Sequence, residues 1–348
     1  MIYVGMDIHK RTTTYCGIDQ DGEIVRRGKV FSGEAGWLKI VQQWPLDEVR
    51  VALETGGMSW WVVDVLRGAG LEPVVVDARR FKLISDSKKK NDRRDARTLA
   101  EGLKGGLAEN CSVSVPSERA RRARSLMRTR QLMVKQAGAT LRAARSLLGS
   151  VGVSISKRDW TEETRWEKVL DNSSLPIWMK PLLLVYRDVW EVLERERLGL
   201  EAMVAEEQSR WPEAELLRAI PGYGPLVTLA VLSSLDDPHR FKHPGQVASY
   251  AGLAPSCRDS GGRQRRGGIT HQGRPLLRYL LVQAAWAALR SKKLTPNLQK
   301  WTSRLIVKRG AKVAVVALGR RLFILGYQLW KNGEVYNPTY PKLEAASA

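Results

Sequence analysis

Residues 2–31 read IYVGMDIHKRTTTYCGIDQDGEIVRRGKVF, with three largely apolar segments separated by short polar breaks. The segments span residues 2–8, 12–18 and 24–31, and they are rich in Ile, Val, Thr and Tyr. β-branched and aromatic residues favour strands, and the break at residues 19–22 has the Asp and Gly content of a tight turn. The stretch therefore predicts three consecutive strands that form a meander.

The following residues extend this sheet with alternating helices and strands. Apolar periodicity predicts a helix over 36–44, a strand over 49–53, a helix over 60–66 and a buried strand over 73–76. With one more helix after residue 91, the order is βββαβαβα. This is the order of an RNase H-like fold, a mixed sheet with helices on both faces.

Acidic residues lie at special positions of this predicted sheet. Asp7 lies on the first strand and Glu54 ends the fourth, and these two strands are neighbours in such a fold. Asp92 and Asp95, in the segment KKKNDRRDARTLAEGL (88–103), share one face of a helix. Four crowded carboxylates repel one another, whereas two Mg²⁺ ions about 4 Å apart neutralise them and suit phosphodiester chemistry. The arginines around the aspartates are predicted to contact phosphates: Arg93, Arg94 and Arg97.

Each carboxylate also has a purely structural interpretation. Asn91 or Asp92 can cap a helix, and Asp95 in its first turn is favoured by the helix dipole. Asp7 can be a residue at the edge of a strand, and Glu54 a cap before the Gly-rich turn that follows it. The residues alone do not decide between these structural interpretations and a metal site.

Composition indicates a globular protein with a polyanionic partner. The 348 residues are 43% hydrophobic and carry 57 basic against 36 acidic side chains, so we expect two or three domains that bind DNA or RNA, or else an anionic membrane surface. Residues 1–78 hold 8 basic and 11 acidic residues, so the excess positive charge lies after them. No membrane span, signal peptide or Cys-based site is predicted, and a cytoplasmic, nucleoid-associated prokaryotic protein is expected.

Residues 113–212, which follow a first domain at 1–112, are predicted to form a basic helical segment. Residues 117–145 hold nine basic residues against Glu118, and a second run steps by four and three from Leu182 to Met203. These patterns predict an antiparallel helical hairpin with coiled-coil character. Its charge is either a solvated face or a phosphate-binding surface, and the predicted contacts are Arg119, Arg121, Arg122, Arg124 and Arg128.

Residues 213–335 are predicted to form a mainly helical C-terminal domain, followed by a tail at 336–348. The segment AIPGYGPLVTLAVLSSL (219–235) places a Pro-Gly-x-Gly-Pro turn before an apolar helix, as in helix-hairpin-helix modules. The backbone at Gly222 and Gly224 would then bind a phosphate, unless the turn is a plain connector. Helices over 241–253 and 275–286 are predicted to flank a loop rich in Gly and Arg.

Ser260 lies in that loop, before two glycines. Arginines nearby would neutralise a phosphate and favour a serine alkoxide; they are Arg258, Arg263, Arg265, Arg266 and Arg274. No His or Asp partner of the triad type is recognisable, so on the residues alone a phosphate-binding turn or a flexible loop is favoured over a nucleophile.

Five motifs in register resemble one known family. They are VGMDIHK (4–10), ALETGG (52–57), KKNDRRDA (89–96), IPGYGP (220–225) and SGGRQRRGGITHQGRPLLR (260–278). Together they are similar to DEDD insertion-sequence transposases, which have a RuvC-like domain followed by a serine-bearing transposase domain. The resemblance spans residues 1 to about 335 and implies a metal-binding tetrad of Asp7, Glu54, Asp92 and Asp95 with Ser260 as nucleophile. Asn91 departs from the threonine expected there, which affects the helix cap rather than a ligand.

The resemblance implies a recombinase that excises and inserts its own element. It further implies Mg²⁺ (or Mn²⁺), a covalent phosphoserine intermediate, and a structured non-coding bridge RNA that pairs with donor and target DNA. A homo-oligomer, dimer or tetramer, would join the metal site of one subunit to the serine of another. The alternatives are a RuvC-type metal-dependent junction resolvase or nuclease and a non-catalytic nucleic-acid-binding scaffold.

Overall fold

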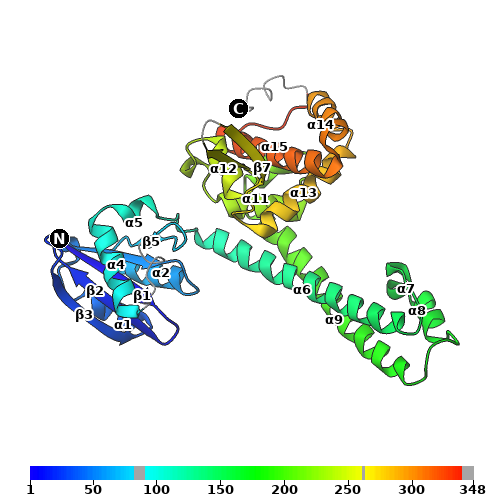
Figure 1. Cartoon of the computed structure of the whole chain (residues 1–348), viewed down its shortest axis with the longest axis horizontal. Coiled ribbons are helices and arrows are strands. Elements are labelled where there is room, and N and C mark those ends of the chain that lie inside the picture. The colour runs from blue at the N-terminus through cyan, green and yellow to red at the C-terminus, as the bar shows by residue number, and fades with distance from the viewer. Residues whose placement is uncertain (82–90, 261–262, 339–348) are drawn as a thin grey trace. The chain divides into compact units, whose positions relative to one another are not determined.

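The computed structural model describes residues 1–81, 91–260 and 263–338, and for residues 257–260 and 263–266 it describes the backbone alone. The chain divides into two compact units, Met1–Val115 (unit 1) and Pro116–Ala348 (unit 2). Figure 1 shows unit 1 in blue to cyan and unit 2 in green to red. Unit 2 contains both the residues predicted as a helical segment and those predicted as a C-terminal domain.

Unit 1 is built on a five-stranded mixed sheet in the order β3-β2-β1-β4-β5. β1 pairs antiparallel with β2 and parallel with β4, which confirms that the first and fourth strands are neighbours. The arrangement is consistent with the predicted RNase H-like domain. The strands are β1 (Ile2–Ile8), β2 (Thr12–Ile18), β3 (Ile24–Phe31), β4 (Val49–Glu54) and β5 (Val74–Val76).

Helices cover both faces of this sheet, as predicted. On one face, Trp37 of α1 and Val62 of α2 pack against Met6 of β1. On the other face, Ala96 and Ala100 of α4 pack against β2. The helices are α1 (Glu34–Val41), η1 (Leu46–Glu48), α2 (Ser59–Gly68), α4 (Asp92–Lys104) and α5 (Leu107–Asn110).

The contact between α4 and β1 is unusually close at Gly5. A Cβ atom on Gly5 would lie 2.0 Å from the Ala96 carbonyl oxygen and 2.8 Å from Leu99 Cβ. Only a residue without a side chain lets the helix backbone rest on the strand in this way. The helix starts where the sequence indicates, because Asn91 is its N-cap and accepts a hydrogen bond from Arg93 N at 3.2 Å. Gly5 therefore sets how near α4 comes to β1.

Two long helices, α6 (Glu118–Gly149) and α9 (Met179–Ser209), lie side by side in unit 2 (Figure 1). Between them in the chain are α7 (Lys157–Thr161) and α8 (Glu163–Leu170), whose tryptophans pack with Leu148 of α6 and Leu183 of α9. The two helices and their pairing were predicted, but the packing face of α9 differs from the predicted one. Leu182, Val189 and Met203 are exposed, whereas Leu183 and Val204 are buried.

Charged pairs explain this difference. Arg130 binds Glu201 of α9 with N···O 2.5 Å, and Arg122 binds Glu207 at 2.8 Å. Glu207 is buried, and the stems of long charged side chains can cover apolar surface. Apolar spacing alone therefore misplaces the packing face by about one residue.

The remaining helices of unit 2 share one core with α11, which is buried from its third residue to its end. All residues from Val227 to Leu235 are buried, as expected of a helix that is apolar all round. The elements are α10 (Ala214–Arg218), α11 (Pro225–Leu235), η2 (Pro238–Arg240), α12 (Pro244–Tyr250), α13 (Pro275–Leu289), α14 (Pro296–Arg309) and α15 (Ala311–Asn332).

Helix α15 is the one helix of the described residues that is long and apolar enough to cross a membrane. However, 67% of its apolar window is buried inside the protein. Arg321, within the same helix, lies 3.7 Å from the centre of the Trp301 ring on α14. No such span was predicted from the sequence, and the burial of α15 fits a core helix of unit 2.

The predicted loop around Ser260 is instead a β-hairpin. β6 (Pro255–Ser260) pairs antiparallel with β7 (Arg263–Ile269), and Ser260 is opposite Arg263. The prediction was wrong because backbone hydrogen bonds hold these strands without the apolar alternation that reveals a strand in sequence. The predicted helix over 241–253 is also shorter, since only Pro244–Tyr250 is α-helical. Gly261 and Gly262 lie outside the described residues.

Candidate active site

Asp7 and Glu54 project from the same face of the sheet, the face covered by α4. In the parallel register Met6 is opposite Leu53, so Asp7 and Glu54 occupy the next position on each strand. Leu53 belongs to the core on the α1 side, whereas Ala52 packs with Leu99 of α4. Because side chains alternate along a strand, Glu54 faces the α4 side with Ala52.

Helix α4 brings two more carboxylates to this edge. Asp92 is the first residue of α4, and Asp95 lies one turn further on. Burial raises the pKa of Asp7, the nearby His9 acts to lower it, and the negative charges of Asp92 and Asp95 raise it further. The Asp7 side chain is only 14% exposed. Three of the four predicted carboxylates are therefore close enough to influence one another.

His9 also belongs to this group, although it was not predicted from the sequence. Its Nε2 lies 3.1 Å from Asp7 Oδ2 and 3.5 Å from Asp92 Oδ1. One ligand atom from each of these three residues lies within 4.8 Å of the others, an arrangement that could hold a metal ion. The signal was present in the motif VGMDIHK, because residues two apart on a strand face the same side. Among the described residues, that tight group does not include Glu54 or Asp95.

The donor set fits a divalent cation. Carboxylate oxygens are the ligands that Mg²⁺ and Mn²⁺ prefer, and an imidazole suits Mn²⁺ better than Mg²⁺. Burial is the largest cause of the raised pKa of Asp7, and the charges of Asp92 and Asp95 raise it further. A bound cation would supply positive charge next to these carboxylates.

The three arginines predicted beside the aspartates lie on α4 and are exposed. Arg97 donates from Nε to Glu101 Oε1 at 2.7 Å, so part of its charge is balanced within the helix. A groove of about 400 Å³ beside Asp92 is lined by Arg93 and by Arg27 and Lys29 of β3. Positive charge thus borders the carboxylates, as expected of a site that receives a phosphodiester.

The arginines of α6 make several contacts within unit 2. Arg119 lies 4.1 Å from the centre of the Trp211 ring, and Arg122 pairs with Glu207. Arg124 donates to the Ser233 carbonyl at 2.7 Å, near the end of α11. Arg121 also has an interaction partner. Arg128 is exposed and lines a second groove. Their role in nucleic-acid binding remains a prediction.

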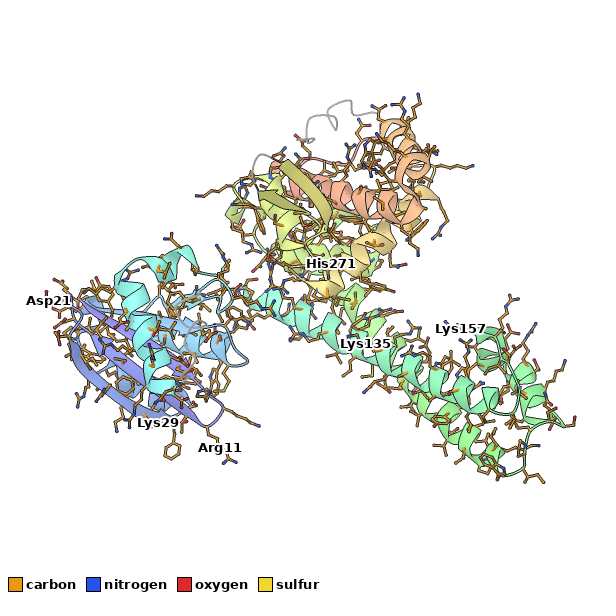
Figure 2. The ribbon with its side chains drawn as sticks, in the orientation of Figure 1. Arg11, Asp21, Lys29, Lys135, Lys157 and His271 are labelled. Carbon is orange, nitrogen blue, oxygen red and sulfur yellow. The ribbon has the colours of Figure 1, made fainter. Side chains whose placement is uncertain are left out.

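This second groove, of about 630 Å³, is lined by both basic and apolar side chains. Arg124, Arg128, Lys135 and Arg274 contribute the charge, and Met127, Leu132, Leu276 and Leu277 contribute much of the apolar wall. Figure 2 shows the Lys135 side chain on α6. The groove therefore offers both a positive surface and an apolar one.

A cluster of three arginines surrounds Tyr250 next to this groove. Arg274 donates to the Tyr250 hydroxyl at 2.7 Å, and Arg240 lies 4.9 Å from its ring centre. Burial acts to raise the pKa of Tyr250, but the charges of Arg274, Arg124 and Arg240 outweigh it and lower the pKa. Burial and the neighbouring Arg274 also lower the pKa of Arg124 to about 10. Arg124 and Arg274 were predicted from the sequence as nucleic-acid contacts, whereas Arg240 and Tyr250 were not.

The Pro-Gly-x-Gly-Pro turn is fixed by packing. Gly222 has φ +85, and a Cβ there would lie 2.1 Å from the Ala284 carbonyl of α13. Tyr223 is buried and donates from its hydroxyl to the Leu322 carbonyl at 3.0 Å. Gly224 is the N-cap of α11, and no other atom comes within 4 Å of where its Cβ would be. Gly222 thus has a structural role, and a phosphate at Gly224 remains a prediction.

The backbone of the β6–β7 hairpin places Ser260 at the end of one strand, beside the arginine-rich second strand. Arg258 on β6 is opposite Arg265, and Cys257 is opposite Arg266. Arg263, opposite Ser260, begins β7. The hairpin therefore brings Ser260 and four of its predicted arginines onto one two-stranded sheet.

Comparison with known proteins matches this chain to transposases in each case reported below. Residues 4–152 match the sequence model of DEDD transposases of IS110 elements, described as a transposase. Residues 214–300 match the model described as the transposase IS116/IS110/IS902 family. The chain is 28% identical over 343 residues to the transposase for insertion sequence element IS1111A of Coxiella burnetii, covering 96% of this chain and 90% of the relative. It is 27% identical over 339 residues to a probable family 20 transposase of Pseudomonas aeruginosa, covering 96% and 98%.

Proposed function

Because this chain belongs to the IS110/IS116 family of DEDD insertion-sequence transposases, enzymes that cut and rejoin DNA, we propose that it exchanges strands through a covalent phosphoserine intermediate. The observation that carries the proposal is the gathering of Asp7, Asp92 and Asp95 at one edge of the unit 1 sheet. Unit 2 supplies the second element, Ser260 on an arginine-rich hairpin.

In this proposal the four carboxylates of unit 1 hold the metal. Asp7, Glu54, Asp92 and Asp95 would bind Mg²⁺ or Mn²⁺, which polarises the phosphodiester and stabilises the charge that develops on its oxygens. His9 hydrogen-bonds to Asp7 at 3.1 Å and orients that carboxylate. Arg93, Arg94 and Arg97 neutralise the neighbouring phosphates.

Ser260 performs the bond exchange. Its hydroxyl oxygen forms a bond to phosphorus while the bond from phosphorus to one sugar oxygen breaks. The serine proton passes to a base, and the leaving sugar oxygen takes up a proton to become a hydroxyl. The energy of the broken bond is kept in the serine ester, so the strand can be rejoined to a new partner by the reverse step. The arginines of the hairpin, including Arg263 and Arg265, balance the phosphate charge.

The proposal includes a structured guide RNA and a homo-oligomer, and a nucleoid location follows from the DNA partner. The large positive charge supports two nucleic-acid partners, since the chain carries 57 basic and 36 acidic residues. Sequencing of the RNA that copurifies with the protein is expected to give one transcript encoded beside the gene. Recovery of a random mixture of cellular RNA would contradict the proposal that the protein binds one specific guide RNA.

Exposed apolar residues on α9 support the homo-oligomer. Leu182, Val185, Val189 and Val192 recur at steps of three and four, and each is between 46% and 59% exposed. Such spacing is typical of a helix face that packs against another helix. We therefore propose that α9 pairs with a second copy of the chain.

Glutamate at both Val185 and Val189 is expected to convert the oligomer to a monomer, because two charges would be buried in an apolar contact. Mass photometry or light scattering after gel filtration measures the change. Val307→Glu is the matched control, since Val307 on α14 is 90% exposed and lies elsewhere in unit 2. An unchanged mass for the double variant would remove α9 as the contact.

The decisive test of the chemistry is transfer of label from DNA to protein. End-labelled DNA carrying the element's ends is incubated with Mg²⁺, and the protein is then denatured and separated on a gel. Wild type is expected to retain label, and Ser260→Ala to retain none. Release of cut DNA with no label on wild-type protein would favour the alternative, a RuvC-type nuclease in which water attacks. Equal labelling of wild type and Ser260→Ala would show that another residue is the nucleophile.

A further inference from the structure

Phe31, the last residue of β3, is exposed to solvent without any evident use in the fold. Its side chain is 85% exposed, more than any other aromatic residue among the described large hydrophobic side chains. A single exposed apolar residue is ordinary on a protein surface. Phe31 is of interest because of its position relative to the carboxylates of unit 1.

The register of the sheet places Phe31 on the same face as the carboxylates. Asp7 on β1 is opposite Thr14 on β2, and Thr14 is opposite Lys29 on β3. Directly opposite residues project to the same face, so Lys29 shares the face of Asp7. Phe31 follows two residues later, roughly 7 Å along the strand, and therefore shares that face as well.

The groove of about 400 Å³ described above runs beside β3 at Arg27 and Lys29, and Phe31 follows Lys29 on the same strand. Lys29 Nζ lies 3.7 Å from Asp92 Oδ2, so the groove begins at the carboxylates. Arg27 and Arg93 also line it. Arg11, exposed in the turn after β1, adds a positive charge near Phe31, because its carbonyl accepts a hydrogen bond from the neighbouring Ser32 N at 3.0 Å. Figure 2 labels Arg11 and Lys29, which extend outward from unit 1.

We propose that β3 and the start of α4 bind a single-stranded DNA segment that leaves the metal site. Lys29, Arg27 and Arg93 contact its phosphates, and Phe31 stacks on an unpaired base. The proposal rests on the proposed function, since the strand is the one whose phosphodiester is cut.

The chemistry of the surface favours a single strand over other occupants. A row of cations ending in an exposed aromatic ring is the combination that binds unpaired nucleotides, because the ring stacks on any base. A base inside a duplex presents only its edges in the grooves and cannot stack on a side chain without leaving the helix. A protein partner would be expected to meet more apolar surface than this groove offers, since most of its named side chains are polar or charged.

The test uses the full-length protein in EDTA, so that binding is measured without cleavage. Anisotropy is recorded for a short labelled DNA strand, the matching duplex and the matching RNA strand. Phe31→Leu is expected to weaken binding of the single strand about fivefold or more, while Phe31→Trp retains it. Lys29→Ala is expected to reduce the salt dependence of single-strand binding by about 0.7 in log–log slope. Val25→Ala, on the same strand and 48% exposed, is the matched control and should bind like wild type.

Photocrosslinking gives a direct reading of stacking. DNA strands containing 5-iodouracil are irradiated with the protein, and the modified peptide is identified by mass spectrometry. Attachment at Phe31 supports the proposal. Attachment only elsewhere, equal binding by Phe31→Leu and wild type, an equal loss for single strand and duplex, or tighter binding of RNA than of DNA would each overturn it.

Failure of this inference is distinguishable from failure of the proposed function. The crosslink and the binding are measured in EDTA, whereas label transfer to Ser260 requires Mg²⁺. A Phe31 crosslink without transfer to Ser260 would leave the strand-binding surface intact and remove the covalent mechanism. Label transfer to Ser260 without a Phe31 crosslink would support the covalent mechanism and remove the strand-binding surface.

Discussion

Asp7→Asn is expected to lower the rate of DNA strand cleavage by roughly a thousandfold or more, while the protein remains folded. A metal ion provides several kcal/mol of transition-state stabilisation, and each 1.4 kcal/mol is about tenfold in rate. Asn is nearly isosteric with Asp, so the loss is in charge rather than in packing. Single-turnover cleavage of labelled DNA in excess protein measures the effect, and Glu54→Gln is expected to behave in the same way.

The same substitution is expected to stabilise the metal-free protein. Burial and the charges of Asp92 and Asp95 raise the pKa of Asp7 above its ordinary value. The folded state therefore holds this proton more tightly than the unfolded state, and ionisation of Asp7 costs stability as pH rises through that range. In EDTA, Asp7→Asn should consequently have a higher Tm than wild type at neutral pH, with a difference that disappears at low pH.

Bound metal is expected to reverse the order of the two Tm values, so that wild type becomes more stable than Asp7→Asn. Mn²⁺ at a hundred times its dissociation constant would stabilise wild type by about 2.7 kcal/mol and Asp7→Asn by much less. Thermal scans at several pH values, with EDTA or Mn²⁺, measure both effects. A variant that cuts DNA at the wild-type rate would exclude Asp7 from the active site. Equal stabilisation of both proteins by Mn²⁺ would place the ion elsewhere.

Gly5→Val is expected to destabilise unit 1 by roughly 1–3 kcal/mol or more, the usual cost of overpacking a closely packed contact. The first added carbon would already lie 2.0 Å from the Ala96 carbonyl oxygen. Helix α4 would have to move away from β1, and it would carry Asp92 and Asp95 away from Asp7. Chemical denaturation measures the stability, and Mn²⁺ titration measures the loss of metal affinity.

Gly68→Ala is the matched control for Gly5. Gly68 is the last residue of α2, and no atom lies within 4 Å of its ideal Cβ position. Alanine there is expected to be neutral or slightly stabilising, because alanine favours a helix over glycine. Wild-type stability for Gly5→Val would show that α4 is not held against β1 as described.

The sheet of unit 1 could be predicted from sequence almost residue by residue. The first three strands, residues 2–8, 12–18 and 24–31, were predicted with the bounds that the structure shows. Short segments rich in β-branched residues between polar turns leave few alternatives. The neighbouring positions of β1 and β4 followed from the order of the elements, and with them the expected meeting of Asp7 and Glu54.

The features that were missed depend on contacts between distant residues. Nothing near Arg122 in sequence reveals Glu207, and nothing near Tyr250 reveals that Arg124 and Arg274 surround it. The β6–β7 hairpin was missed because its strands carry Arg and Gly in place of an apolar face. His9 lay within a motif already singled out, and its position two residues after Asp7 was the available signal.

The burial of α11 has a consequence for how unit 2 opens. Its backbone amides from Val227 to Leu235 are enclosed by neighbouring elements on all sides, so water reaches them only when the surrounding helices separate. These amides should therefore be the last of unit 2 to exchange with deuterium. The outward ends of α6 and α9, near α7 and α8, should exchange by smaller local openings, which lets that end rearrange while the centre of unit 2 stays closed.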